Sequence, residues 1–138
     1  MDAFDADVLV YAAVPGHHLG EAVRRLFPDE PAGGERAFAG VGSLLLLPEV
    51  LARPTGQDAS DEVAALAALL GRLDLRPVDE TIASLAAALG ASYRLRSADS
   101  VHLATAVAAG ADRFVTNNRR DFSPSIEEVS VTYPADLA

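Results

Sequence analysis

The sequence contains no cysteine, and its 11 basic residues are all arginine, so lysine is absent as well. Without cysteine the chain has no disulfide framework, no thiolate chemistry and no zinc–cysteine site. No apolar run approaches the roughly 18 residues that are needed to cross a bilayer. The first residues also lack the basic and then apolar layout of a secretory signal peptide. We therefore expect a cytoplasmic protein without a membrane segment.

The sequence does contain enough apolar residues for a folded domain. It has 138 residues, of which 50% are hydrophobic, and it shows no internal repeat, linker or low-complexity segment. A chain of this length buries a proper core, and this composition is not that of a disordered protein. We expect a single domain that spans residues 1–138.

The charge balance is acidic, with 20 acidic residues against 11 basic ones and a formal net charge of −9. A protein that holds nucleic acid through phosphate contacts alone normally has the opposite balance. An acidic protein can still act on RNA if divalent metal ions neutralise its site and arginines cluster locally. Small arginine clusters are present at residues 24–25, 94–96 and 119–120, although each alone is also typical of solvated helix ends.

The most informative stretch is residues 96–122. Its pattern predicts a buried helix with Ser97 as N-cap and Gly110 at its end, followed by a short apolar strand at 113–116. The polar residues 117–121 then form a loop at the carboxyl end of that strand. In open α/β sheets this end of the strands is where ligands bind.

The N-terminal residues allow two interpretations. Residues 3–12 could be one long strand, or a short strand could end at Asp5, with Asp7 as the N-cap of a helix that begins at Val8. We prefer the second interpretation, because it removes an ionisable residue from the middle of an otherwise apolar strand.

The central part of the chain alternates helical and extended patterns. Ser43 could cap a helix that runs to Ala52, or Pro48 could open one as its first residue, and both place Glu49 in an apolar helical segment. The other expected elements are helices at 18–27, 60–73 and 81–89 (the last stopped by Gly90), a loop at 28–34, and strands at 74–78 and 129–133. Strands interleaved with helices predict an α/β fold with a parallel sheet.

Four acidic residues stand beside apolar residues rather than in a charged run: Asp5, Glu49, Asp99 and Asp121. Taken singly, three of them have ordinary explanations as a helix-start acid, a surface ion pair or an exposed helix position. Asp5 is harder to explain, because a carboxylate at a strand end in the core is unfavourable unless it is hydrogen-bonded or paired with a metal. Several carboxylates without cysteine point to a hard cation such as Mg²⁺ or Mn²⁺.

Three segments together resemble the PIN-domain family, and within it the VapC-like toxin ribonucleases of type II toxin–antitoxin pairs. They are FDADVLVYA at 4–12, PEVL at 48–51 and ADSVHLATAVAAGADRFVTNNRRDF at 98–122. The resemblance implies a three-layer α/β/α fold with a central parallel sheet. It also implies that Asp5, Glu49 and Asp99 match the first three acids of the family and Asp121 the fourth.

The activity that this resemblance implies is metal-dependent hydrolysis of RNA, with Mg²⁺ or Mn²⁺ as cofactor. Asp5, Asp99 and Asp121 would be the direct metal ligands, and Glu49 would bind through water or orient the nucleophile. The candidate substrate-binding residues are Thr116, Asn117, Asn118, Arg96, Arg119 and Arg120.

Two positions depart from the family pattern. Asp7 stands where most members have asparagine or serine, and it adds negative charge near the expected metals. Asn118 stands where many members have an acid. Either Asn118 or Asp121 could therefore complete the ligands of a second metal. His102 lies on the same helix side as Asp99, but we expect a hydrogen-bonded packing histidine rather than a catalytic one.

The resemblance also implies two protein partners, a second copy of the chain and an antitoxin whose tail lies in a groove near the active site. The apolar side chains available for such surfaces are Leu19, Leu26, Phe27, Leu44 to Leu47, and Leu51. An antitoxin arginine would then reach the carboxylates and compete with the metal.

Other interpretations compete with a nuclease. The segment at 5–8 also resembles the opening of haloacid-dehalogenase-type phosphatases, but that chemistry needs a lysine and the chain has none. A non-catalytic PIN-fold module that binds RNA or protein is the main alternative. A plain α/β domain, whose acids are all caps and surface charges, leaves the coincidence of four acids with the flanking motifs unexplained.

Overall fold

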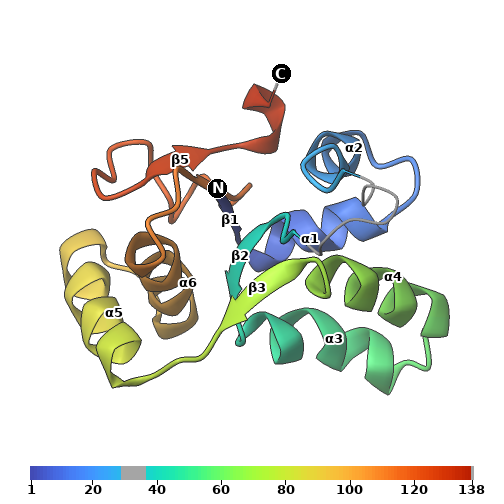
Figure 1. The fold of residues 1–138 in the computed structure, drawn as a ribbon, viewed down its shortest axis with the longest axis horizontal. Helices are drawn as coiled ribbons and strands as arrows, with labels where there is room; N and C mark the ends of the chain where they lie inside the picture. Colours follow the sequence, from blue (N-terminus) through green and yellow to red (C-terminus); the bar gives the residue numbers. More distant parts are fainter. Residues whose placement is uncertain (29–36, 138) are drawn as a thin grey trace.

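The described residues form a sheet of five parallel strands. A computed structural model describes residues 1–28 and 37–137, so the loop predicted at 28–34 lies outside them apart from Pro28. The strands are β1 (Asp2–Phe4), β2 (Gly40–Ser43), β3 (Leu73–Arg76), β4 (Arg113–Val115) and β5 (Ser130–Thr132). Their order is β3-β2-β1-β4-β5, and every neighbouring pair is parallel (Figure 1). All the carboxyl ends therefore lie at one edge of the sheet.

Helices cover both faces of this sheet. They are α1 (Ala6–Ala13), α2 (His18–Arg24), α3 (Leu46–Gly56), α4 (Ser60–Leu70), α5 (Glu80–Tyr93) and α6 (Ser97–Ala108), with a short 3₁₀ turn, η1 (Pro134–Asp136), after β5. Helices α1, α3 and α4 pack on one face, and α5 and α6 pack on the other (Figure 1). The predicted three-layer α/β/α fold is confirmed. None of the described helices is long and apolar enough to span a membrane.

Alternate residues of the strands point to opposite faces, which divides the core into two layers. Ala3 of β1 and Phe114 of β4 pack with α5 and α6, whereas their neighbours Phe4 and Val115 pack with α1, α3 and α4. All four side chains are buried. The two central strands are thus apolar on both sides, as expected for a parallel sheet that helices cover.

The N-terminus follows the preferred interpretation, except that the helix cap is a different residue. Strand β1 ends at Phe4, and Asp5, not Asp7, is the N-cap of α1. Asp5 Oδ1 accepts a hydrogen bond of 2.8 Å from the Ala6 backbone N–H. The chain passes from strand to helix without an intervening loop, so α1 begins two residues earlier than predicted and Asp7 lies in its first turn.

Strand β2 is an element that the sequence pattern did not predict, because glycine has a low strand propensity. The structure explains the two glycines. A Cβ at Gly40 would lie 2.3 Å from the Asp2 carbonyl oxygen, and a Cβ at Gly42 would lie 2.6 Å from Leu46 Cδ1. Helix α3 begins at Leu46, so neither Ser43 nor Pro48 opens it as predicted.

Several predicted helix ends were wrong by a few residues. Helix α3 continues to Gly56 rather than Ala52, and it contains Pro54. Helices α2 and α4 each end three residues before the predicted end. Helix α6 has Arg96 as its N-cap, and no side chain caps it, so Ser97 is its first residue rather than its cap.

Gly90 does not end α5, which continues to Tyr93 and ends where Arg94 takes a left-handed conformation, with φ of 56°. A Cβ at Gly90 would lie 2.6 Å from the Ser100 side-chain oxygen on α6. The glycine therefore serves the close approach of α5 to α6. Because α6 leads back into the parallel strand β4, its start lies toward the carboxyl edge of the sheet.

Candidate active site

Asp5 and Thr116 occupy equivalent places at the carboxyl edge of the sheet, each directly after a central strand. The Asp5 backbone N–H donates to the Val115 carbonyl oxygen at 3.0 Å, which continues the pairing of β1 with β4 by one residue. The Thr116 hydroxyl donates to Asp5 Oδ2 at 2.7 Å. Both residues are buried. Both oxygens of the Asp5 carboxylate are thus held in place, Oδ1 by the start of α1 and Oδ2 by the end of β4.

The Asp5 carboxyl is in an environment that disfavours its charge. Burial raises the pKa of Asp5 above its usual value, and the charge of Glu49 adds to the rise. The hydrogen bond from Thr116 and the charge of His102 oppose that shift. The pKa remains raised, so Asp5 is a carboxylate that a nearby cation would stabilise.

Asp7 is a second carboxylate at this edge, in the first turn of α1. Its Oδ2 accepts a hydrogen bond of 3.1 Å from the Asn117 backbone N–H, whereas Oδ1 is buried and has no hydrogen-bond partner among the described residues. Burial, and after it the charge of Asp5, raises the pKa of Asp7 to about 7. The structure therefore places Asp7 within the acidic cluster, and not as the helix cap that the sequence suggested.

The loop after β4 fixes Asp121 through Asn118. Asn118 Nδ2 donates to Asp121 Oδ2 at 3.0 Å, and the Asp121 backbone N–H donates to Asn118 Oδ1 at 3.2 Å. The Asn118 backbone N–H in turn donates to the Thr116 hydroxyl at 3.1 Å. These contacts connect Asp121 to Asp5 through Asn118 and Thr116. Asn118 thus holds the Asp121 carboxylate in place through Oδ2.

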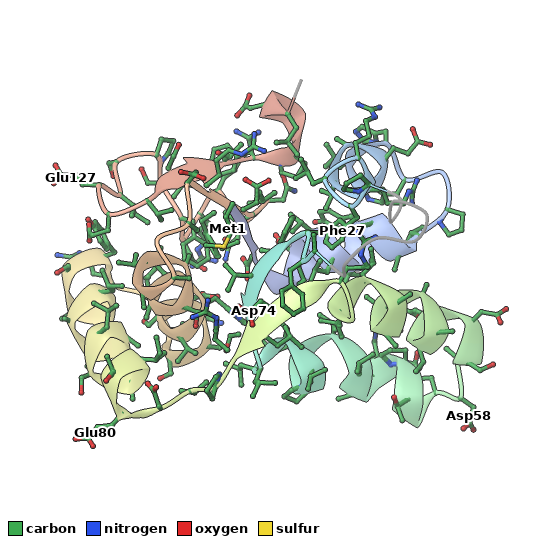
Figure 2. The ribbon with its side chains drawn as sticks, in the orientation of Figure 1. Met1, Phe27, Asp58, Asp74, Glu80 and Glu127 are labelled. Carbon is green, nitrogen blue, oxygen red and sulfur yellow. The ribbon has the colours of Figure 1, made fainter. Side chains whose placement is uncertain are left out.

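Asp99 lies in the first turn of α6 and belongs to the same cluster. Burial raises its pKa most, followed by the charges of Asp5 and Asp121, with a further contribution from Glu49. Asp99 therefore interacts electrostatically with all three of the other predicted acids. By contrast, the acidic side chains of Asp58, Glu80 and Glu127 lie at the periphery of the molecule (Figure 2).

Glu49 reaches the cluster from α3, and His102 of α6 contacts it. His102 Nε2 lies 3.0 Å from Glu49 Oε1. Burial lowers the pKa of His102, but the Glu49 hydrogen bond and the charges of Glu49, Asp5 and Asp99 together raise it above the usual value. The prediction of a buried, hydrogen-bonded histidine at this position is confirmed, and its partner is one of the predicted acids.

The predicted arginines differ in how firmly they are held. The Arg119 guanidinium lies over the ring of Tyr133, 4.1 Å from its centroid, in a cation–π contact. The Tyr133 hydroxyl donates to the Phe122 carbonyl oxygen at 2.6 Å, so the ring is itself fixed. All three arginines are exposed. Tyr133 holds Arg119 in place at the edge of the polar loop, and Arg96 and Arg120 have no such ring contact among the described residues.

The side chains at the carboxyl edge of the sheet offer the type of ligand atom that a hard divalent cation binds. Asp5, Asp7, Asp99, Glu49 and Asp121 supply only carboxylate oxygens, which Mg²⁺ and Mn²⁺ prefer. The raised pKa values of Asp5, Asp7 and Asp99, and the unpaired Asp7 Oδ1, indicate missing positive charge. Among the described residues, no three acidic or histidine side chains are already arranged as a metal-binding group. Metal binding at this edge would therefore require side-chain adjustment.

Sequence reasoning was wrong about one feature of this site and missed another. It placed the charge of Asp7 near the site but took Asp7 for the helix cap, which is Asp5, and it gave His102 no partner. A signal was present for His102, because it lies three residues after Asp99 on one helix side. The identity of its partner Glu49 depends on the packing of α6 near α3, which a local pattern does not contain.

Comparison with known proteins gives one family. The profile of the PIN domain matches residues 3–124. No curated protein sequence matches the chain significantly.

Solved structures share the fold. A chain in a toxin–antitoxin complex from Klebsiella pneumoniae has a TM-score of 0.72 at 23% identity, over 97% of this chain and 98% of that one. A chain of VapBC2 from Rickettsia felis, solved with a DNA fragment from its promoter, has a TM-score of 0.69 at 16% identity, over 96% and 97%. A chain of VapBC-1 from nontypeable Haemophilus influenzae has a TM-score of 0.68 at 16% identity, over 97% and 98%. At these identities the likeness shows a shared fold.

Proposed function

The chain belongs to the PIN-domain family, and from that premise we propose that it is a metal-dependent ribonuclease and the toxin of a toxin–antitoxin pair. The observation that carries the proposal is the acidic cluster at the carboxyl edge of the sheet. Asp5, Glu49, Asp99 and Asp121 come from separate elements, and Asp99 interacts with the other three through their charges. A cluster that destabilises its own charged state is typical of a functional site.

Asp5, Asp99 and Asp121 would hold Mg²⁺ or Mn²⁺, with Glu49 reaching the ion through water or orienting the nucleophile. When bound, the ion would polarise a phosphodiester and lower the pKa of an attacking water. The chain prepares the site for it, because Thr116 fixes the Asp5 carboxylate and Asn118 fixes the Asp121 carboxylate. The ligands are therefore partly oriented before any ion arrives.

RNA would lie along the polar loop and the start of α6. Arg96, Arg119 and Arg120 are the candidates for phosphate contacts, and Thr116, Asn117 and Asn118 line the site between them and the acids. Arg119 is supported by its fixed position over Tyr133. Because the chain carries a net charge of −9, these local arginines and the metal would supply the positive charge that RNA requires.

The fold likeness to chains of toxin–antitoxin complexes supports an antitoxin partner. Exposed apolar side chains support a homodimer surface and a groove for that partner, since Leu44 and Leu47 are 39% and 36% exposed beside Glu49. Leu46, by contrast, is fully buried and is not available to a partner. A cytoplasmic location follows from the proposed RNA substrate.

The test of the nuclease is RNA cleavage by the purified protein with Mg²⁺ or Mn²⁺, and in EDTA. Wild type should cleave a broad panel of RNAs, and EDTA should abolish the cleavage. Asp5→Asn should be folded and inactive, because the amide keeps an oxygen for the Ala6 N–H but removes a metal-binding charge. Asp58→Asn is the matched control, an exposed residue far from the cluster whose φ of 52° suits asparagine.

Full activity in Asp5→Asn, or cleavage that persists in EDTA, would refute the metal mechanism. A protein that binds Mn²⁺ but cleaves no RNA on the panel would identify the alternative, a non-catalytic PIN-fold module that binds RNA or protein.

A further inference from the structure

His102 joins two helices beneath the acidic cluster. Its side chain is only 1% exposed, and its Nε2 lies 3.0 Å from Glu49 Oε1. Glu49 belongs to α3, whereas His102 belongs to α6, the helix that also carries Asp99. The contact therefore fixes the Glu49 carboxylate relative to the helix that holds Asp99.

The direction of this hydrogen bond follows from its partner. A carboxylate only accepts, so Nε2 carries the proton. Nδ1 is buried and has no hydrogen-bond partner among the described residues. A second proton at Nδ1 would have no acceptor there, whereas the neighbouring carboxylates favour a protonated ring. The donor to Glu49 is Nε2–H in both states, so the contact is the same whether the ring is neutral or charged.

The histidine is a poor choice for packing alone. A buried polar atom without a partner costs about 1–3 kcal/mol, and an apolar side chain of similar volume would leave no such atom at this position. Glu49 does not need the contact to satisfy its charge, because its side chain is 29% exposed and accessible to water. What the contact provides is one fixed orientation for a carboxylate that would otherwise rotate in solvent.

We propose that His102 is a positioning residue of the active site, which holds Glu49 in the orientation that RNA hydrolysis requires. The inference rests on the proposed ribonuclease function. Partners that orient groups around a metal typically contribute about 10–100-fold to activity or metal affinity. Since Glu49 is placed outside the direct ligands, loss of His102 should lower kcat and leave both KM and Mn²⁺ affinity nearly unchanged.

The test is a double-mutant cycle with His102→Leu and Glu49→Gln, assayed for RNA cleavage. We expect each single variant to lose about 10–100-fold in kcat, and the double variant to lose no more than Glu49→Gln alone. His102→Gln should recover most of the activity lost in His102→Leu, because its amide nitrogen can reach the place of Nε2. His102→Asn, whose shorter amide cannot reach it, should not. His18→Leu is the control, an exposed histidine without a contact to the acids.

Mn²⁺ binding, followed by electron paramagnetic resonance without RNA, separates the possible failures. Wild-type Mn²⁺ affinity in His102→Leu, together with lost kcat, supports the positioning role. A normal kcat in His102→Leu, or losses that multiply in the double variant, would overturn it while the ribonuclease stands. If His102→Leu does not fold, the RNA-cleavage activities of His102→Gln and His102→Asn test the proposal instead. Equal activities of these two variants would overturn it. A wild type that neither binds Mn²⁺ nor cleaves RNA would remove the proposed function, and this inference with it.

Discussion

Replacing Asp7 with asparagine should make the protein more stable at pH 8. Asp7 is half-buried, and burial, followed by the charge of Asp5, raises its pKa from 3.8 to about 7. The folded state therefore binds the Asp7 proton more tightly than the unfolded state does. Between these two pKa values the free energy of unfolding falls as pH rises, because folding favours the protonated form that the rising pH removes. At pH 8 the whole of this destabilisation is present.

The magnitude follows from the shift. A rise from 3.8 to about 7 corresponds to about 4 kcal/mol of destabilisation at pH 8, and to about 1 kcal/mol at pH 4.5. Asparagine has no charge, so the variant lacks this pH-dependent destabilisation. Its side-chain oxygen can still accept from the Asn117 N–H. Its amide nitrogen, however, takes the place of the unpaired Oδ1, at a cost of about 1–3 kcal/mol. The net expectation is a gain of about 2 kcal/mol at pH 8 and a loss of about 1 kcal/mol at pH 4.5.

The assay is urea denaturation followed by circular dichroism, at both pH values and with EDTA present. Asp58→Asn is the control for a neutralised but exposed aspartate, and its difference from wild type should be small at both pH values. When the pH 8 measurement is repeated with Mg²⁺ in place of EDTA, the difference in free energy of unfolding between Asp7→Asn and wild type should become smaller, because a bound cation would stabilise the wild-type carboxylates. The reasoning is refuted if Asp7→Asn is less stable than wild type at pH 8, or if its effect is the same at both pH values.

Three further predictions concern helix packing and partners. Gly90→Ala should lower the free energy of unfolding by up to about 2 kcal/mol, because its Cβ would displace the Ser100 hydroxyl from the Arg96 carbonyl oxygen, and the lost hydrogen bond outweighs the roughly 1 kcal/mol that alanine gains over glycine in a helix. Gly56→Ala, with nothing within 4 Å, should be neutral or slightly stabilising, and a Gly90→Ala variant as stable as Gly56→Ala in thermal denaturation would contradict the packing account. Light scattering should give a dimer at tens of micromolar, and a strict monomer would exclude the proposed homodimer. Inhibition by the product of a neighbouring antitoxin gene should weaken as salt or Mg²⁺ rises, and inhibition that is independent of both would exclude an arginine that competes with the metal.

The parts of the fold that were predicted correctly are those with a strong local pattern. The unit formed by α6 and β4 is an example, because its apolar run, the following glycine and the short β-branched strand all agree. Strand β2 was missed because its glycines are explained only by the Asp2 backbone and by Leu46. Gly90 was misread for the same reason, since its neighbour Ser100 belongs to another helix.

The sequence allowed us to predict which acidic residues belong to the site better than how their side chains are held. That Asp5 and the 117–121 loop would meet follows from one rule, that parallel strands end at the same edge. The contacts that orient Asp5 and Glu49 across the site could not be predicted, because they join residues far apart in the chain. Thr116 and Asp5 are 111 positions apart, and His102 and Glu49 are 53 apart.

The position of β1 in the sheet has a consequence for the order in which the protein is made. This strand is synthesised first, yet it lies between β2 and β4, and its partner β4 begins only at Arg113. A nascent chain that ends before that residue already carries Asp5, Glu49 and Asp99, but one side of β1 is unpaired and Asp5 has no hydroxyl to hold it. Pairing across so long a separation is also slow, because the intervening chain must be closed into a loop first. The acidic edge is thus complete only after Thr116, Asn118 and Asp121 have been translated and have left the ribosome, so the acids made earlier are not yet held in the arrangement of the folded site.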